Sequence, residues 1–123
     1  MLYEELSGKV IAAAMEVHKL LGPGFLESIY EHALALELTG RQIPFKRQAT
    51  ITVIYKRAQV GEYRADFLVD SKIILEIKAT AALIAEHQAQ ALHYLTATGL
   101  RLALLFNFGT SSLQFKRIIR QAF

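Results

Sequence analysis

The sequence predicts a single α/β domain with a mixed β-sheet flanked by helices, in the order ααβββαββ. Three observations lead to this prediction. Two stretches of helical periodicity precede any β-like segment, three β-rich segments then follow across short turns, and a buried apolar strand after a further helix requires a crossover. A chain of 123 residues, 53% of them hydrophobic, can bury one core, so residues 1–123 are expected to form one domain.

Residues 1–40 predict two helices joined by a sharp turn. An apolar stripe at helical spacing covers residues 3–20 and stops at Gly22-Pro23-Gly24. The second helix is expected from Phe25 to about Thr39, with Gly40 as its C-cap and with a buried face made of Leu26, Ile29, Ala33 and Leu36. The turn lacks the lysine and the spacing of a nucleotide-binding loop, so a sharp turn is favoured over a phosphate loop and no nucleotide cofactor is expected.

The rest of the chain predicts the sheet and its crossover helix. Residues 49–55 are rich in β-branched side chains, and residues 60–69 alternate well enough to pair with them across a turn at 56–59. Asp70-Ser71 then turns the chain into an apolar, central strand at 72–78. A helix from about Leu83 to Thr98 leads to a strand at 102–106 that is apolar on both faces, and a last strand is expected at about 113–118.

The composition excludes several classes of protein and of site. With no cysteine there is neither a disulfide framework nor a thiolate metal site, and the four histidines lack the spacing of zinc ligands. No apolar run approaches the ~20 residues that span a bilayer, and Glu4 and Glu5 lie where a signal peptide carries positive charge. A cytoplasmic protein without a membrane partner is therefore expected.

The net charge of +3 is unevenly distributed. Residues 1–40 hold six acids and two bases, whereas residues 41–64 hold six bases and Glu62 alone. A second basic cluster lies near the C-terminus. Both clusters are candidates for binding the phosphates of a nucleic acid, and the alternative is that they are solvated strand edges where Lys and Arg discourage aggregation. The candidate contacts are Lys46, Arg47, Arg64, Lys116 and Arg117.

Asp66 and the tripeptide Glu76-Ile77-Lys78 place charges on strands that otherwise have the pattern of buried core. Such charges are costly to bury, so they suggest chemistry. Residues two apart on a strand share a face at about 6.6 Å, so Glu76 and Lys78 are expected to point the same way and Ile77 the opposite way. Antiparallel pairing across the short turn can bring the Asp66 carboxylate alongside Glu76.

Two adjacent carboxylates favour a hard divalent cation, with Mg²⁺ as the natural choice. Lys78 beside such an ion could orient or activate an attacking water and hold a phosphate oxygen, so the reaction indicated is phosphodiester hydrolysis. The alternative is a same-face ion pair between Glu76 and Lys78, with Asp66 on an exposed sheet face. A solvated pair contributes at most about 1 kcal/mol and requires no function.

Asp66, the step to Glu76 and the pattern Glu76-x-Lys78 resemble the core signature of the PD-(D/E)XK nuclease superfamily, whose αβββαβ core is similar to the order predicted here. Gln90-Ala91-Leu92-His93-Tyr94 resembles the QxxxY element that follows the ExK lysine in RecB-like exonucleases. Ala65 stands where the superfamily's name has proline, which carries no ligand atom and chiefly shapes the backbone. Over nearly the whole chain the sequence resembles the GxxExxY protein family, through residues 24–30, 64–66, 76–78 and 104–109.

This resemblance implies a restriction-endonuclease-like core and a nuclease that uses Mg²⁺ or Mn²⁺. It implies that Asp66, Glu76 and the backbone carbonyl of Ile77 bind the metal, and that Lys78 assists the nucleophilic water. Glu27 is implied as the acidic residue of the helix before the sheet, although the helix macrodipole alone also favours a carboxylate there.

Three further residues on the helices are candidates. Gln90 and Tyr94 lie four apart on one helix, so both could lean over the site and hold substrate phosphate or a metal-associated water. The alternative is that both are ordinary polar residues of an otherwise apolar helix. Tyr30, three residues after Glu27, is a candidate nucleic-acid contact.

Two functions stay open from the sequence. The first is a metal-dependent nuclease with DNA as the favoured substrate, and the second is a non-catalytic nucleic-acid-binding or protein-interaction module that keeps the nuclease fold. A chain this small has little surface with which to grip a duplex, so a homodimer is expected.

Overall fold

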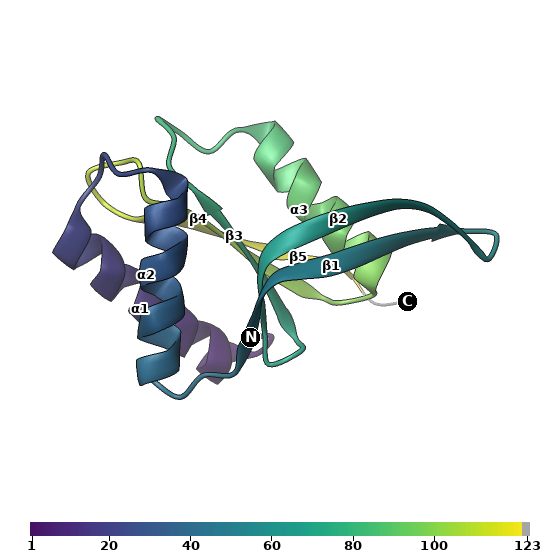
Figure 1. The fold of residues 1–123 in the computed structure, drawn as a ribbon, viewed down its shortest axis with the longest axis horizontal. Helices are drawn as coiled ribbons and strands as arrows, with labels where there is room; N and C mark the ends of the chain where they lie inside the picture. Colours follow the sequence, from purple (N-terminus) through teal and green to yellow (C-terminus); the bar gives the residue numbers. More distant parts are fainter. Residues whose placement is uncertain (122–123) are drawn as a thin grey trace.

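The structure is a computed structural model that describes residues 1–121. Its elements follow the predicted order ααβββαββ (Figure 1). They are α1 (Glu4–Leu21), α2 (Glu27–Gly40), β1 (Phe45–Tyr55), β2 (Ala58–Val69), β3 (Ile73–Lys78), α3 (Ala85–Thr98), β4 (Leu102–Asn107) and β5 (Gln114–Ile119). Within the described residues, no helix is long and apolar enough to cross a membrane.

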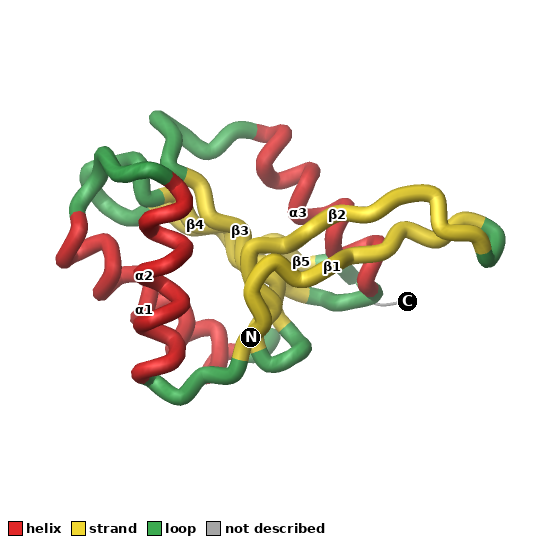
Figure 2. Tube along the Cα trace, viewed as in Figure 1, coloured by secondary structure: helices red, strands yellow, loops and turns green. Residues whose placement is uncertain are grey.

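The strands of residues 1–121 form one sheet in the order β1-β2-β3-β4-β5. β3 and β4 are parallel and are joined through α3, while the other neighbouring pairs are antiparallel. The predicted mixed sheet and its helical crossover are therefore confirmed. Figure 2 shows α1 and α2 on one side of the sheet and α3 on the other, with the β1–β2 ribbon extending past the rest of the sheet.

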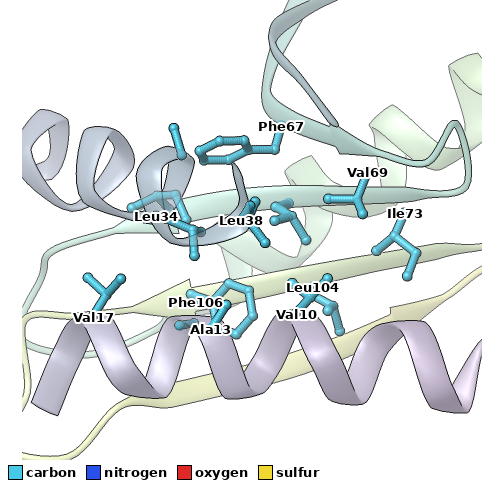
Figure 3. Packing of buried hydrophobic residues seen from close by; sticks show 14 of the residues in the cluster. Val10, Ala13, Val17, Leu34, Leu38, Phe67, Val69, Ile73, Leu104 and Phe106 are labelled. Atoms are coloured by element: carbon cyan, nitrogen blue, oxygen red, sulfur yellow. The ribbon is translucent and has the colours of Figure 1, made fainter. Parts of the chain in front are cut away.

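Each face of the sheet contributes to its own hydrophobic cluster. The larger cluster packs α1 and α2 against side chains such as Phe67 and Phe106 (Figure 3). The smaller one packs α3 against the other face, through residues such as Ile74 and Ala103. β3 and β4 serve both clusters, and burial of a large apolar side chain stabilises the fold by about 1.5–3 kcal/mol. The apolar contacts of β3 and β4 can therefore best offset the cost of burying a charged group in the sheet.

The predicted buried face of α2 is wrong. The buried residues are Tyr30, Leu34, Ala35 and Leu38. Of the predicted set, Leu26 is 72% exposed, Leu36 67% and Ile29 40%, and Ala33 only packs at the margin of the larger cluster. The helix carries apolar residues on more than one face, so periodicity did not select the face that meets the sheet.

The β1–β2 hairpin is longer than its β-branched pattern predicts. β1 begins at Phe45, and the turn is reduced to Lys56 and Arg57, since Tyr55 pairs with Ala58. Both turn residues have positive φ, of 48° and 70°, as tight hairpin turns require. The start of β1 was not predicted because its residues are mostly polar. Polar and basic side chains are common on a strand at the edge of a sheet, where β1 lies.

Arg117 fastens the beginning of α1 to the last strand. Its Nη1 donates a hydrogen bond to Ser7 Oγ at 2.8 Å and its Nη2 donates to the Leu2 carbonyl at 2.7 Å. It pairs with Leu104, whose side chain belongs to the cluster beneath α1 and α2. The prediction that Arg117 contacts nucleic acid is therefore not carried forward, because the guanidinium is already engaged within the fold.

Replacing Arg117 with Leu is expected to lower the free energy of unfolding by about 2 kcal/mol, because two hydrogen bonds from a charged group are lost and Ser7 keeps a part-buried hydroxyl without this partner. Urea unfolding measures the change. Lys116→Ala is the control, since the neighbouring side chain is exposed and its loss should change stability by less than about 0.5 kcal/mol. Equal effects of the two changes would contradict the role given to Arg117.

Candidate functional site

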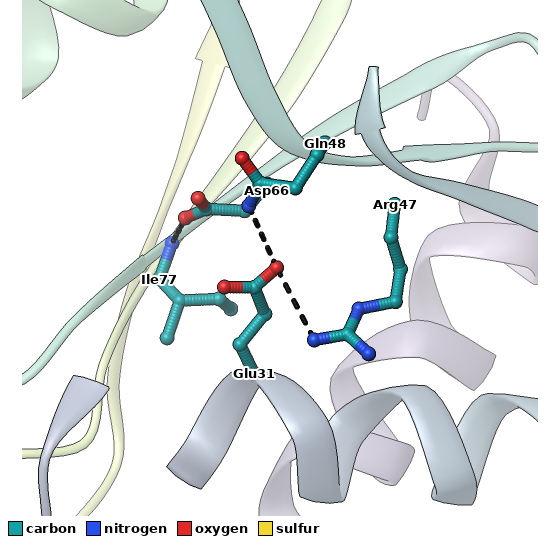
Figure 4. A network of polar contacts seen from close by, with 5 residues as sticks. All are labelled: Glu31, Arg47, Gln48, Asp66 and Ile77. Carbon is teal, nitrogen blue, oxygen red and sulfur yellow. Dashed lines mark hydrogen bonds and ion pairs between the residues drawn. The ribbon is translucent and has the colours of Figure 1, made fainter. Parts of the chain in front are cut away.

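Asp66 and Glu76 meet where β2 and β3 run side by side. The antiparallel register pairs Phe67 with Leu75, and its continuation brings Asp66 opposite Glu76. Asp66 Oδ2 accepts a hydrogen bond from the Ile77 backbone N–H at 2.7 Å (Figure 4). The two carboxyl groups are therefore neighbours, as the strand pairing predicts.

The ribbon is irregular at Asp66. The ladder between β1 and β2 pairs Arg47 with Phe67 and then Ala49 with Ala65, and passes over Gln48, whose φ is 49°. Phe67 belongs to the cluster under α1 and α2, whereas Ala65 packs with α3. Residues two apart on a regular strand share a face, so β2 changes the layer it serves at Asp66. Backbone of this kind is concentrated at functional sites.

Side chains from α2 and β1 brace this irregularity. Glu31 Oε1 accepts a hydrogen bond from Gln48 Nε2 at 2.8 Å, and Arg47 lies 3.5 Å from the same oxygen (Figure 4). The brace connects the start of β1 to α2 beside Asp66. The predicted phosphate contact by Arg47 would have to share the guanidinium with Glu31.

Glu76 is the buried ionisable residue that the sequence pattern predicts on this strand. Its side chain is 4% exposed, and Oε1 has no hydrogen-bond partner among the described residues. Burial, followed by the repulsion of Asp66, raises the pKa of Glu76 to about 9, and the attraction of Lys78 opposes this only in part. Glu76 is therefore protonated near neutral pH unless a cation lies beside it.

Lys78 points to the same face as Glu76, toward α3. Its Nζ lies 3.5 Å from Gln90 Oε1, a long hydrogen bond that keeps the ammonium at the edge of the site. In the part of the chain that the structure describes, no ion pair joins Lys78 to Glu76. The alternative prediction of a simple ion pair between them is therefore wrong.

α3 and α2 bring further polar groups to the site. Tyr94 is 5% exposed, and burial followed by the charges of Glu76 and Asp66 raises its pKa to about 12, so its hydroxyl remains a proton donor. Glu27 lies in the first turn of α2. Desolvation raises the pKa of Glu27, the charge of Lys78 lowers it and that of Asp66 raises it, although its exposed position weakens these interactions.

Tyr30 has a structural position that the sequence did not reveal. Its side chain is 0% exposed, its hydroxyl donates to the Gly22 carbonyl and accepts from the Phe25 N–H, and its ring stacks on Phe108 at 4.7 Å. A side chain that is buried in this way cannot contact a nucleic acid, so the prediction for Tyr30 is wrong. Tyr30 instead holds the turn that leads into α2 and thereby places Glu27.

Three exposed basic side chains lie on strands near the site. The register runs from Glu76 to Leu105 and from Leu105 to Lys116, so Lys116 lies on the same row as Glu76, two strands and about 10 Å away. Lys46 and Arg64 are exposed on β1 and β2. These three remain candidates for holding phosphate.

Asn107 is a residue of the site region to which the sequence analysis assigned no role. It pairs with Lys78 at the end of β4 and is 0% exposed. Its Oδ1 accepts from the Thr80 N–H at 2.9 Å and the Gly109 N–H at 3.0 Å, while Nδ2 donates to the Thr80 carbonyl at 3.1 Å and to Gln114 Oε1 at 3.0 Å. The amide therefore clamps the segment that directly follows Lys78.

The backbone beside this clamp is equally constrained. The Phe108 N–H donates to the Lys78 carbonyl at 2.8 Å, and a Cβ atom at Gly109 would collide with the backbone of Ala79 and Thr80. An Asn at the end of a strand that is apolar on both faces, followed by Phe and Gly, was the available sequence signal. Together these contacts hold the chain in register on both sides of the Lys78 backbone.

The residues of the site fit a hard divalent cation. Residues 1–121 contain no group of three or more His, Cys, Asp or Glu side chains arranged to hold a metal, so protein carboxylates would supply two ligands, Asp66 and Glu76. Mg²⁺ is commonly held by one or two carboxylates with several waters. A cation beside Glu76 Oε1 would satisfy that atom and would favour ionisation of the carboxyl group.

Without a metal, Glu76 is expected to make stability fall as the pH rises. The folded pKa of about 9 exceeds the ordinary 4.5, so between these values the folded state binds more protons than the unfolded state. The free energy of unfolding then decreases by up to about 1.4 kcal/mol per pH unit. Glu76→Gln should remove this slope and be more stable than the parent at pH 8, which urea unfolding in EDTA measures. The exposed control Glu86→Gln should keep the parent's slope. The same slope in Glu76→Gln would contradict the raised pKa given to Glu76.

Asn107→Ala is expected to destabilise the protein by at least about 2 kcal/mol, because it leaves the Thr80 amide and carbonyl without their partner. Gln114→Ala is the matched control, since it removes one neighbour of Asn107 at an exposed position. Urea unfolding compares the two. A loss of stability at Gln114 as large as that at Asn107 would contradict the clamp.

Comparison with known proteins agrees with this fold. No curated protein matches the sequence. A solved structure titled "Crystal structure of SSO0001" matches with a TM-score of 0.62 and 17% sequence identity, which shows a shared fold. The match covers 78% of this chain and 51% of that one, so the chain spans about half the length of that protein. Residues 4–118 match the sequence profile of the PD-(D/E)XK nuclease superfamily, and the chain therefore belongs to that superfamily.

Proposed function

We propose that this protein is a Mg²⁺- or Mn²⁺-dependent nuclease that hydrolyses phosphodiester bonds, with DNA as its preferred substrate. The observation that carries the proposal is the buried Glu76 carboxyl group, which lies beside Asp66 and has an oxygen without a hydrogen-bond partner in the described chain. Buried polar atoms are normally paired, and this one has a natural explanation in a cation. Membership in a superfamily of nucleases supports the same reaction class.

In this proposal Asp66, Glu76 and the Ile77 carbonyl hold the cation, and Glu27 faces it from α2. When bound, the cation supplies the positive charge that polarises the phosphodiester and makes nearby water more acidic. Lys78 orients the attacking water and stabilises charge on a phosphate oxygen.

Residues of α3 assist from the opposite wall. Gln90 holds the Lys78 ammonium through its Oε1, 3.5 Å away. Tyr94 keeps its proton, because its pKa is raised to about 12, and can donate a hydrogen bond to a phosphate oxygen. Exposed Lys46, Arg64 and Lys116 attract the polyanion.

We also assign the chain to the GxxExxY group within the superfamily, and its motif has a physical explanation. Gly24 has a φ of 109°, which favours glycine. Tyr30 bonds the turn around it through Gly22 and Phe25. The Gly and the Tyr thus shape and anchor the loop that presents Glu27 at the start of α2, and the motif acts as a support for that carboxylate.

The proposal is tested with labelled single-stranded and duplex DNA and RNA in Mg²⁺, Mn²⁺ or EDTA. Cleavage is expected only with the metals, and Asp66→Asn, Glu76→Gln and Lys78→Ala should each lower its rate at least about 100-fold. Lys72→Ala is the control, since Lys72 precedes the same strand and pairs with Asp70. Cleavage that persists in EDTA, or in all three variants, would refute the proposal.

The second candidate function is a binding module that keeps the fold without turnover. It is favoured if calorimetry detects a Mg²⁺ site that Asp66→Ala abolishes, while no substrate is cut. Absence of both metal binding and salt-sensitive nucleic-acid binding would count against both functions. The homodimer and the cytoplasmic location remain predictions from the sequence.

A further inference from the structure

An exposed aromatic ring adjoins the proposed site. Tyr63 lies on β2, three residues before Asp66, and is 46% exposed. Its ring centroid is 5.2 Å from that of Tyr94, with the two planes tilted by 46°. Tyr94 in turn lies within the electrostatic influence of Glu76 and Asp66. Tyr63 therefore contacts a residue of the proposed site.

Two hollows open on either side of Tyr63, between the β1–β2 ribbon and α3. The first, of about 330 Å³, is lined by Tyr63, Glu86, Ala89, Gln90, His93 and Tyr94. The second, of about 370 Å³, is lined by Val53, Ile54, Tyr63, His93, Thr96 and Ala97. Tyr63 and His93 line both and so form the ridge between them, and the first hollow is also lined by Gln90, which bonds Lys78.

We propose that the Tyr63–His93 ridge and its two hollows bind unpaired nucleobases of a single-stranded segment next to the phosphodiester that is cut. This inference rests on the proposed function and names its substrate class. Base stacking on an exposed aromatic ring tolerates any base, because every base has a π-face. Bases in a duplex are already stacked and paired, so they cannot enter hollows of this kind.

The ribbon that carries the ridge is basic. Lys56 and Arg57 form its tip, and Arg64, next to Tyr63, is exposed on the opposite face of β2, because Tyr63 and Ala65 both face α3. These cations lie along the ribbon whose apolar side chains line the second hollow, including Ile54, which is 58% exposed. Basic groups beside an aromatic stacking platform are the general arrangement by which proteins hold single strands.

The test measures the affinity of the full chain for a labelled single-stranded oligonucleotide and for a blunt duplex of the same sequence, by fluorescence anisotropy in EDTA at low salt. The wild type should bind the single strand more tightly. Tyr63→Ala should weaken single-strand binding at least about 5-fold and change duplex binding less than about 2-fold, because stacking is lost. Tyr63→Phe should retain the affinity, since the ring is kept.

Two further variants keep the test decisive. Tyr55→Ala is the matched control, because Tyr55 is a 61% exposed tyrosine of the same ribbon that lines neither hollow. His93→Ala should reproduce the selective loss from the other side of the ridge, and it replaces Tyr63→Ala if that variant fails to fold. Equal single-strand and duplex affinities in the wild type, or losses that are the same for Tyr55→Ala, would overturn the inference.

The outcome is separable from that of the nuclease proposal. If metal-dependent cleavage is observed but single-strand binding is insensitive to Tyr63 and His93, the ridge inference fails and the nuclease stands. If single-strand binding depends on the ridge while no metal-dependent cleavage occurs, the ridge stands and the protein is a binding module.

Discussion

The pairing of β2 with β3 at Asp66 and Glu76 is the constraint on which the rest of the site depends. The hydrogen bond from the Ile77 N–H to Asp66 Oδ2 continues the contact between the strands where a carboxylate replaces the regular ladder partner. This places two carboxyl groups side by side at a buried position, and the surrounding elements converge on them. The crossover helix α3 brings Gln90 and Tyr94 to them, and the turn held by Tyr30 sets where α2 begins.

Burial of Glu76 works against stability, and in the proposed function it favours binding of a metal ion. The pKa of about 9 means that the protein keeps this group neutral in the absence of a cation, at a cost that grows with pH. β3 tolerates this because its apolar side chains are buried on both faces, and because the Asn107 clamp and the Phe108 N–H hold the end of the strand. A group that is destabilising when alone and satisfied by a divalent ion couples folding stability to metal binding.

Two residues predicted to contact nucleic acid have structural partners that the sequence did not reveal. Arg117 fastens the start of α1 to β5, and the buried Tyr30 anchors the turn before α2. Conversely, the sequence analysis predicted no role for Tyr63 or Asn107, because one Tyr on a strand or one Asn at a strand end forms no repeating pattern. Burial and the distance to a partner, which the sequence does not give, distinguish a structural from a functional use of the same side chain.

What the sequence determined by itself was the order of elements and the pair of carboxylates. Both rest on short-range patterns: β-branched runs, helical stripes and charges on strands that are otherwise apolar. The tertiary structure decided which stripe of α2 is buried, the irregularity at Gln48 and Asp66, the Glu76 oxygen that has no partner within residues 1–121, and the ridge between β2 and α3. These depend on packing between segments distant in the chain, and a helix with apolar residues on two faces leaves that packing undetermined until the sheet is in place.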